Sequence, residues 1–119
     1  MSQFQRLRLD EVSDVTIVRF LEHRFIDGLE IENLGQELYQ LVEGGKRRKL
    51  LLDFGAVELF SSAGFGKLIS LNGKVRANNG VLRLCNVPPH LADVFRVCRL
   101  DRIFDIRKDE SDALMAFAS

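Results

Sequence analysis

Two adjacent serines, Ser61 and Ser62, are the residues whose type and position are best suited to chemistry. They come shortly after Leu50 to Leu52, a continuous apolar run that is typical of a strand covered on both faces. Small residues and an apolar series beginning at Phe65 follow them, which indicates that a helix starts at the serine pair. The start of a helix just past the carboxyl end of a strand is where α/β domains usually carry functional residues.

A hydroxyl group at the start of a helix can play three different roles. It can cap the helix, which stabilises it by about 1 kcal/mol. It can accept a phosphoryl group, whose oxygens would meet free backbone N–H groups and the positive end of the helix dipole. It can also act as a nucleophile, but the chain lacks G-x-S-x-G, and neither His23 nor His90 has a carboxylate placed to support such a role. The residues alone favour capping and predict that the protein is not an enzyme.

Composition limits the other functions. The 119 residues predict one domain spanning 1–119, and 46% apolar with 29% charged residues is the balance of an ordinary soluble protein. The 17 basic and 17 acidic residues cancel, which argues against a nucleic-acid binder. No apolar run reaches the ~18 residues of a membrane span, and Met1 leads into polar residues rather than a signal peptide, so we expect a cytoplasmic protein without membrane contact.

No cofactor or metal is expected. Gly64-Phe65-Gly66-Lys67 matches neither nucleotide-binding glycine motif. Cys85 and Cys98 form no C-x-x-C, and we predict two buried, reduced thiols. The run Lys46 to Lys49 is short and lies beside a Gly-Gly turn, which favours a solvated loop over a phosphate-binding patch.

Hydrophobic periodicity predicts the elements that position the serines. Five strands are expected, at Phe4–Val12, Val15–Leu21, Lys49–Leu52, Val81–Cys85 and Ile103–Ile106. Four helices are expected, at Leu29–Glu43, from the serine pair to about Ala77, after Pro88-Pro89, and from Glu110 to about Ala118.

Several links and core positions follow from the same patterns. Gly44-Gly45 should end the first helix, and Asn78-Asn79-Gly80 the second. We expect loops or links at His23–Gly28, Val57–Phe60 and Arg99–Arg102. The core faces of the second and third helices are predicted to be Phe65, Leu68 and Ile69, and Leu91, Val94, Phe95 and Cys98.

The order of these elements predicts an α/β fold. The tight link at Ser13-Asp14 implies that the first two strands form an antiparallel hairpin, with the second strand further inside the sheet. Strands then alternate with helices, a pattern that predicts parallel strands with right-handed crossovers. We therefore expect a mixed, mostly parallel sheet packed with about four α-helices.

Several motifs resemble one family. The stretch Asp53-Phe54-Gly55, with Phe60 to Gly66 after it, is similar to the signature D-x-S/T-x-x-x-x-x-D-S-S-G-L-G of STAS domains, the family of bacterial anti-sigma-factor antagonists. Asn79 to Leu84 resembles the glycine-led strand that follows the long helix in that family. Cys98 to Phe104 and Asp109 to Leu114 resemble its T-G-L-x-x-x-F link and its closing D-E-x-x-A-L. The resemblance covers nearly the whole chain and rests on the order and spacing of these pieces.

The resemblance implies a function without chemistry of the domain's own. Members of the family bind a GHKL-type serine-kinase anti-sigma factor and so release a sigma factor, and the kinase inactivates them by phosphorylating a serine at the start of the central helix. By position that phosphoacceptor is Ser62, while Ser61 stands where the family often has aspartate. The resemblance also implies a phosphatase as a second partner, and a monomer or weak dimer.

The same resemblance implies a partner-binding surface around the serines. Asp27 matches an acidic position near the interface, and Ser61, Ser62 and Gly64 belong to the expected surface. Phe65 is either a core residue or an apolar contact for the partner. The alternative function is a STAS module of another assembly, a transport complex or a larger signalling complex, without control of a sigma factor.

Overall fold

The structure is a computed structural model that describes residues 4–43 and 47–118. The predicted stop at Gly44-Gly45 and the first residue of the charge run, Lys46, lie outside the described residues, as does the polar start of the chain. In chain order the elements are β1 (Leu7–Val12), β2 (Val15–Phe20), β3 (Arg24–Phe25), α1 (Gly28–Val42), β4 (Lys49–Asp53), β5 (Leu59–Phe60), α2 (Ser62–Ala77), β6 (Val81–Cys85), α3 (Pro89–Val97), a 3₁₀ turn (Leu100–Arg102), β7 (Asp105–Arg107) and α4 (Glu110–Ala118).

The main sheet has five strands in the order β1-β2-β4-β6-β7. The hairpin β1–β2 is antiparallel and every other neighbouring pair is parallel. At the centre of the sheet, Leu51 of β4 is in register with Ile17 of β2 and Arg83 of β6. The predicted mixed, mostly parallel sheet with an N-terminal hairpin and helical covering is therefore confirmed.

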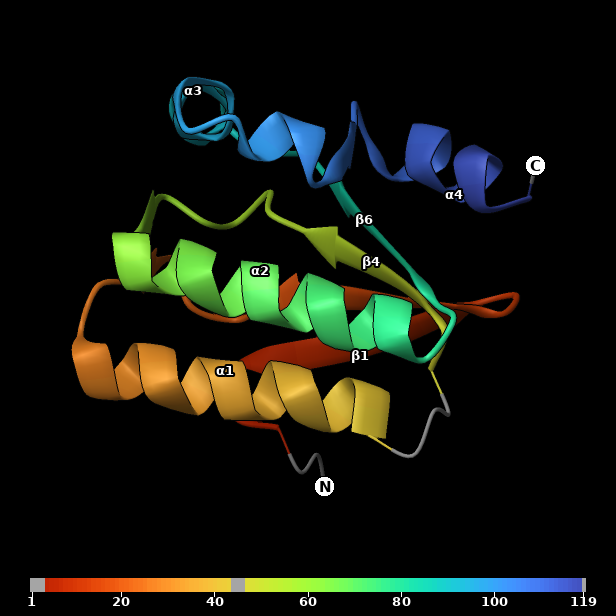
Figure 1. The fold of residues 1–119 in the computed structure, drawn as a ribbon, viewed down its shortest axis with the longest axis horizontal. Helices are drawn as coiled ribbons and strands as arrows, with labels where there is room; N and C mark the ends of the chain where they lie inside the picture. The colour runs from red at the N-terminus through yellow and green to blue at the C-terminus, as the bar shows by residue number, and fades with distance from the viewer. Residues whose placement is uncertain (1–3, 44–46, 119) are drawn as a thin grey trace.

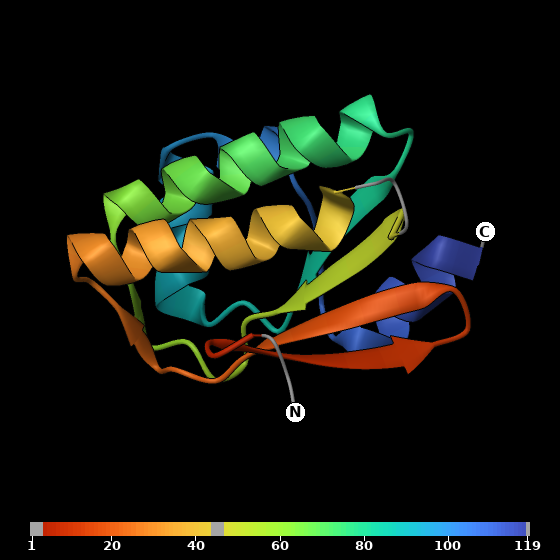
Figure 2. The same cartoon turned by 90° about the horizontal axis from the view of Figure 1, so that it is seen from below.

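Helices cover both faces of the sheet. Helices α1 and α2 run side by side over one face, as Figures 1 and 2 both show. Alternate residues of β4 serve the two faces: Leu50 and Leu52 belong to the large core with α1, α2 and α3, whereas Leu51 belongs to a smaller core beneath α4. All three leucines are fully buried, so the apolar run is a strand covered on both faces, as predicted.

Short elements differ from the prediction. The stretches predicted as loops at His23–Gly28 and Val57–Phe60 contain β3 and β5, which pair in parallel as a separate two-stranded sheet. Strands of two residues are too short to show any periodicity. The last strand begins at Asp105 rather than Ile103, because the 3₁₀ turn extends the preceding link through hydrogen bonds from Ile103 N and Phe104 N to Leu100 O.

Two predicted core positions are wrong. Ile69 is exposed, and Leu71 and Val75 instead continue the buried face of α2 begun by Phe65 and Leu68. Cys98 is exposed as well. Helix α3 ends at Val97, the residue before Cys98. Cys98 therefore does not follow the helical spacing that placed it on the predicted core face.

The two thiols should therefore differ sharply in reactivity. Cys85 is buried beneath α4, and this burial raises the pKa of its thiol to about 12, with a further contribution from the charge of Asp53. Since only the thiolate reacts, we expect one fast thiol, Cys98, and one that reacts only on unfolding. Labelling with an aromatic disulfide reagent at neutral pH measures both. The variant Cys98→Ser should lose the fast phase, and a fast reaction that persists in this variant would contradict the burial of Cys85.

Candidate functional site

The serine pair lies at the start of α2, as the sequence predicted. Ser61 is the N-cap residue with extended backbone angles, and its carbonyl oxygen accepts hydrogen bonds from the N–H groups of Gly64 (2.9 Å) and Phe65 (3.3 Å). Its side chain makes no capping hydrogen bond, and its Oγ is buried with no partner among the described residues. The expected side-chain cap is thus absent at Ser61. Ser62, the first residue of the helix, is exposed.

The small sheet of β3 and β5 fixes where the serines stand. Strand β5 leads directly into α2, and β3 ends just before α1. The N–H of Ser61 donates to Phe25 O at 2.9 Å, and the N–H of Glu58 donates to His23 O at 2.7 Å. These bonds join the two segments, so α1 and α2 begin at the same end of the molecule (Figure 1).

Asp27 occupies the neighbouring helix start. It is the N-cap of α1, and its Oδ1 accepts hydrogen bonds from Leu29 N at 2.8 Å and Glu30 N at 3.3 Å. The carboxylate is exposed, so one side chain both caps the helix and contributes charge to the surface near Ser62. The acidic position that the resemblance implies is therefore present at the expected helix end.

Gly64 and Phe65 lie beneath this surface rather than on it. A Cβ on Gly64 would come within 2.6 Å of the Phe60 ring, so glycine is required here for close packing and not for an accessible backbone. Phe65 is 7% exposed and makes edge-to-face contacts with Phe60 and Phe95, at centroid distances of 5.2 and 5.1 Å. The burial of Phe65 agrees with its interpretation as a core residue, and its contact with a partner stays a prediction.

Exposed apolar side chains surround the helix starts. Ile26 and Leu59 are 57% and 42% exposed, and Leu29 in the first turn of α1 is 71% exposed. Leu59 belongs to β5, Ile26 to the residues that join β3 to α1, and Leu29 to α1 itself. We call Ile26, Asp27, Leu29, Leu59 and Ser62 the helix-start surface. Apolar groups gathered around a few polar ones are typical of a protein-binding surface.

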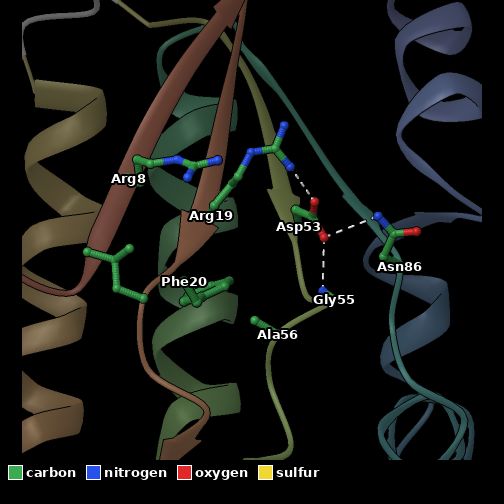
Figure 3. A pocket seen from close by; sticks show the side chains of 8 residues that line it. Arg8, Arg19, Phe20, Asp53, Gly55, Ala56 and Asn86 are labelled. Carbon is green, nitrogen blue, oxygen red and sulfur yellow. Dashed lines mark hydrogen bonds and ion pairs between the residues drawn. The ribbon is translucent and has the colours of Figure 1, made fainter.

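A second cluster lies on the opposite side of the sheet, around Arg19. Its guanidinium donates to Asp10 (2.7 Å), Asp53 (2.6 Å) and Glu110 (2.8 Å), which come from β1, β4 and the start of α4. These carboxylates raise the pKa of Arg19, and the Arg19 hydrogen bond lowers the pKa of Asp10. Asp53 Oδ1 also accepts from Gly55 N (2.9 Å) and from the Asn86 amide (3.2 Å) (Figure 3).

Asp53 links this cluster to the serines. It ends β4, and its bond to Gly55 N holds the first turn of the segment that leads through β5 to Ser61. A cavity of about 350 Å³ opens beside the cluster, with Arg8, Phe20 and Ala56 among its lining residues. The aspartate that opens the motif is therefore a positioning residue, and its side chain does not belong to the helix-start surface.

The comparison with family models decides where the chain belongs. The model of the STAS domain matches residues 6–113, nearly the whole chain. The chain belongs to the STAS domain family. This STAS domain has the element order that the motifs implied, and the signature residues Asp53 and Ser61 to Gly66 fall at the end of β4 and the start of α2.

Relatives and solved structures agree with this assignment. The chain is 29% identical over 112 residues to the putative anti-sigma factor antagonist BtrV of Bordetella bronchiseptica, with 94% of each chain covered. It resembles an anti-sigma-factor antagonist STAS domain protein from Planctomyces limnophilus at 26% identity and a TM-score of 0.82, covering 95% and 98% of the two chains. The phosphorylated form of SpoIIAA from Bacillus matches at 18% identity and a TM-score of 0.70, covering 93% and 98%. That last likeness shows the fold alone.

The two histidines of this STAS domain bond backbone carbonyls. Within residues 4–43 and 47–118, the His23 ring bonds the carbonyl of Ala56 and the His90 ring that of Glu58, and neither ring has a hydrogen bond to a serine. The same residues contain no group of three or more potential metal ligands, and none of their helices is long and apolar enough to span a membrane.

Sequence reasoning missed the Arg19 cluster and the exposed apolar groups. The partners of Arg19 lie 9, 34 and 91 residues away along the chain, so no local pattern announces them. Ile26 and Leu59 gave a weak signal, since each is an apolar residue in a stretch expected to be a loop. They became recognisable as part of one surface only once β3 and β5 were paired.

Proposed function

We propose that this chain is an anti-sigma-factor antagonist, and that phosphorylation of Ser62 controls its binding to the anti-sigma factor. The observation that carries the proposal is that Ser62 is exposed at the first residue of α2, in the position of the family's phosphoacceptor. Membership of the STAS family and the likeness to the putative anti-sigma factor antagonist of Bordetella support the choice of partner.

The partner is a GHKL-type serine kinase that is itself the anti-sigma factor. It transfers the terminal phosphoryl group of ATP to Ser62 Oγ, so that an O–P bond forms, the bond to ADP breaks and the serine proton passes to a base of the kinase. A phosphatase reverses the change by hydrolysis. The STAS domain supplies only the acceptor and the surface that both enzymes recognise.

The local electrostatics suit a phosphoserine at this position. The first turn of α2 contains no acidic residue. Among the described residues, the N–H groups of Ser62 and Ala63 have no hydrogen bond to another backbone group. A phosphoryl group, with about −1.5 to −2 charges, therefore meets free donors and the positive end of the dipole. The fold should tolerate the modification.

The helix-start surface explains how the modification changes binding. In the unmodified protein, Ile26, Leu29 and Leu59 can be buried against a partner together with a neutral hydroxyl. After phosphorylation the same contact would have to bury a dianion, which is costly unless the partner provides matching cations. Asp27 adds one more negative charge, and Gly64 and Phe65 support the surface from below.

Phosphoryl transfer to single-site variants tests the proposal. The protein is purified from its native cells together with the kinase that binds it, and incorporation of radiolabel from ATP is measured. Ser62→Ala should show no labelling and should still bind the kinase, whereas Ser62→Asp should bind more weakly. The matched control is Ser61→Ala, which removes a buried hydroxyl without a described partner and should label like the wild type.

Three outcomes would contradict this proposal. Undiminished labelling of Ser62→Ala would remove Ser62 from the mechanism. Labelling lost only in Ser61→Ala would move the acceptor by one residue. Recovery of transporter subunits in place of a kinase would instead favour a STAS module of another assembly.

A further inference from the structure

A small apolar cavity opens next to Ser62, between the start of α2 and the end of α3. Its volume is about 270 Å³. Its lining consists of Phe60, Ser62, Phe65, Val94, Cys98 and Leu100. Apart from the Ser62 hydroxyl and the Cys98 thiol, every side chain in this lining is apolar, so the cavity suits an apolar group better than a polar one.

Two arginines follow the lining residue Cys98 in the chain, and neither has a described partner. Arg99 stands between the lining residues Cys98 and Leu100, and the N–H of Arg102 donates to Arg99 O at 3.3 Å, one 3₁₀ turn further on. Both side chains are exposed, and neither guanidinium has an ion pair or hydrogen bond within the described residues. Arg96 differs, since it pairs with Asp93 at 3.0 Å.

Folding does not explain why Arg99 is an arginine. Its φ of 59° lies in the left-handed region, which favours glycine or asparagine and penalises residues with longer side chains. A strained residue with an unpaired, exposed charge at the edge of an open cavity suggests a role in binding. The stretch 93–102 contains three arginines and two aspartates, so a negative group is the favoured neighbour.

We propose that this cavity receives one apolar side chain of the partner protein, and that an adjacent carboxylate of the same segment pairs with Arg99 and Arg102. This inference rests on the proposed function, because it assigns part of the partner's recognition to the surface around Ser62. The occupant is thus a protein segment with a leucine or phenylalanine flanked by glutamate or aspartate.

The cavity also gives the Ser62 switch a direct mechanism. Ser62 lines the cavity, so a phosphoryl group on its hydroxyl stands at the opening and obstructs the incoming side chain. Its negative charge would also repel the carboxylate that the partner brings to Arg99 and Arg102. Phosphorylation would then exclude the partner by blocking the cavity and repelling this carboxylate, with no change in the fold.

Peptide titration followed by NMR tests this proposal without the kinase. The probe is an acetylated, amidated hexapeptide, Glu-Glu-Leu-Phe-Glu-Glu, titrated into isotope-labelled protein to millimolar concentration. We expect amide shifts at residues 62–65 and 98–100. A peptide with lysine in place of each glutamate tests the charge requirement, and one with alanine in place of the leucine and phenylalanine tests the apolar requirement. Both should bind more weakly.

Variants separate binding from stability. Arg99→Asn removes the cation but suits the left-handed backbone, so it should weaken binding of the acidic peptide about three- to fivefold, the value of one exposed ion pair, and leave the melting temperature unchanged or higher. Cys98→Phe should fill the cavity and abolish binding. Val97→Phe is the matched control, because it adds the same ring at an exposed position outside the cavity lining, and it should bind normally. Ser62→Asp should weaken binding.

The proposal fails if no amide shifts appear or if the shifts lie elsewhere on the protein. It also fails if the lysine peptide binds as tightly as the glutamate peptide, or if Arg99→Asn binds the glutamate peptide as tightly as the wild type does. Failure here is distinguishable from failure of the proposed function. If Ser62 is labelled but no peptide binds, only the binding role of the cavity is wrong. If the peptide binds but Ser62 is not labelled, only the phosphorylation of Ser62 is wrong.

Discussion

Replacing Leu51 with alanine is expected to lower the free energy of unfolding by about 2 to 5 kcal/mol. Leu51 is fully buried at the middle of β4, and it packs with Ile17, Cys85 and Phe117 in the smaller core beneath α4. Strands pair with β4 on both sides, so the surrounding backbone can relax little into the space that the lost atoms leave. Urea unfolding measures the change in the free energy of unfolding, with its dependence on urea concentration fitted for each protein.

Ile69→Ala is the matched control for this substitution. Ile69 is 41% exposed on α2, so the same kind of truncation should change the free energy of unfolding by only about 0.5 kcal/mol. If Leu51→Ala cost less than about 1 kcal/mol, the core beneath α4 would not contribute as described. An equal loss in the two variants would contradict the difference in burial.

The long elements of this fold were predictable because they repeat a pattern. Helix α1 carries Ile31, Leu34, Leu38 and Leu41 at helical spacing, and all four are buried. Strand β4 contains the uninterrupted apolar run Leu50 to Leu52, and the hairpin has a tight link. In these elements the spacing of the apolar residues indicates the same buried face that tertiary packing produces, so the local pattern is sufficient to predict the element.

The site was predictable in position but not in detail. The apolar run and the small residues placed Ser62 at a helix start, which the structure confirms. They could not show that Ser61 Oγ is buried, that Gly64 packs against Phe60, or that Cys98 lies beyond the end of its helix. Each of these depends on contacts between elements that are distant in the sequence, and residue type alone does not encode them.

The Arg19 cluster joins residues that lie as much as 91 positions apart in the sequence. Arg19→Met should lower the free energy of unfolding by about 2 to 3 kcal/mol near neutral pH. The substitution leaves the carboxylates of Asp10, Asp53 and Glu110 without their shared cation, and the Asp53 side chain is only 13% exposed. The loss should fall below the 3 to 5 kcal/mol typical of a fully buried pair, because the Arg19 side chain keeps 28% of its surface exposed.

Acid should reduce the difference between Arg19→Met and the wild type. The Arg19 hydrogen bond holds the pKa of Asp10 below 3.8, its ordinary value in the unfolded chain. A carboxyl group whose folded pKa is depressed contributes stability above the unfolded pKa and loses it as the pH falls through the folded pKa. The gap in unfolding free energy should thus be full near pH 7 and narrow below about pH 4.

Arg8→Met is the matched control, since it also removes a guanidinium beside Asp10. Arg8 is 62% exposed and lies 3.3 Å from that carboxylate, so the variant should lose at most about 1 kcal/mol. Urea unfolding of the three proteins at several pH values separates the possibilities. Equal losses for Arg8→Met and Arg19→Met would mean that Arg19 is an ordinary surface cation, and a gap that widens in acid would contradict the lowered pKa of Asp10. The expected result would instead identify Arg19 as the residue that fastens α4 and the hairpin to β4, the strand that leads to Ser62.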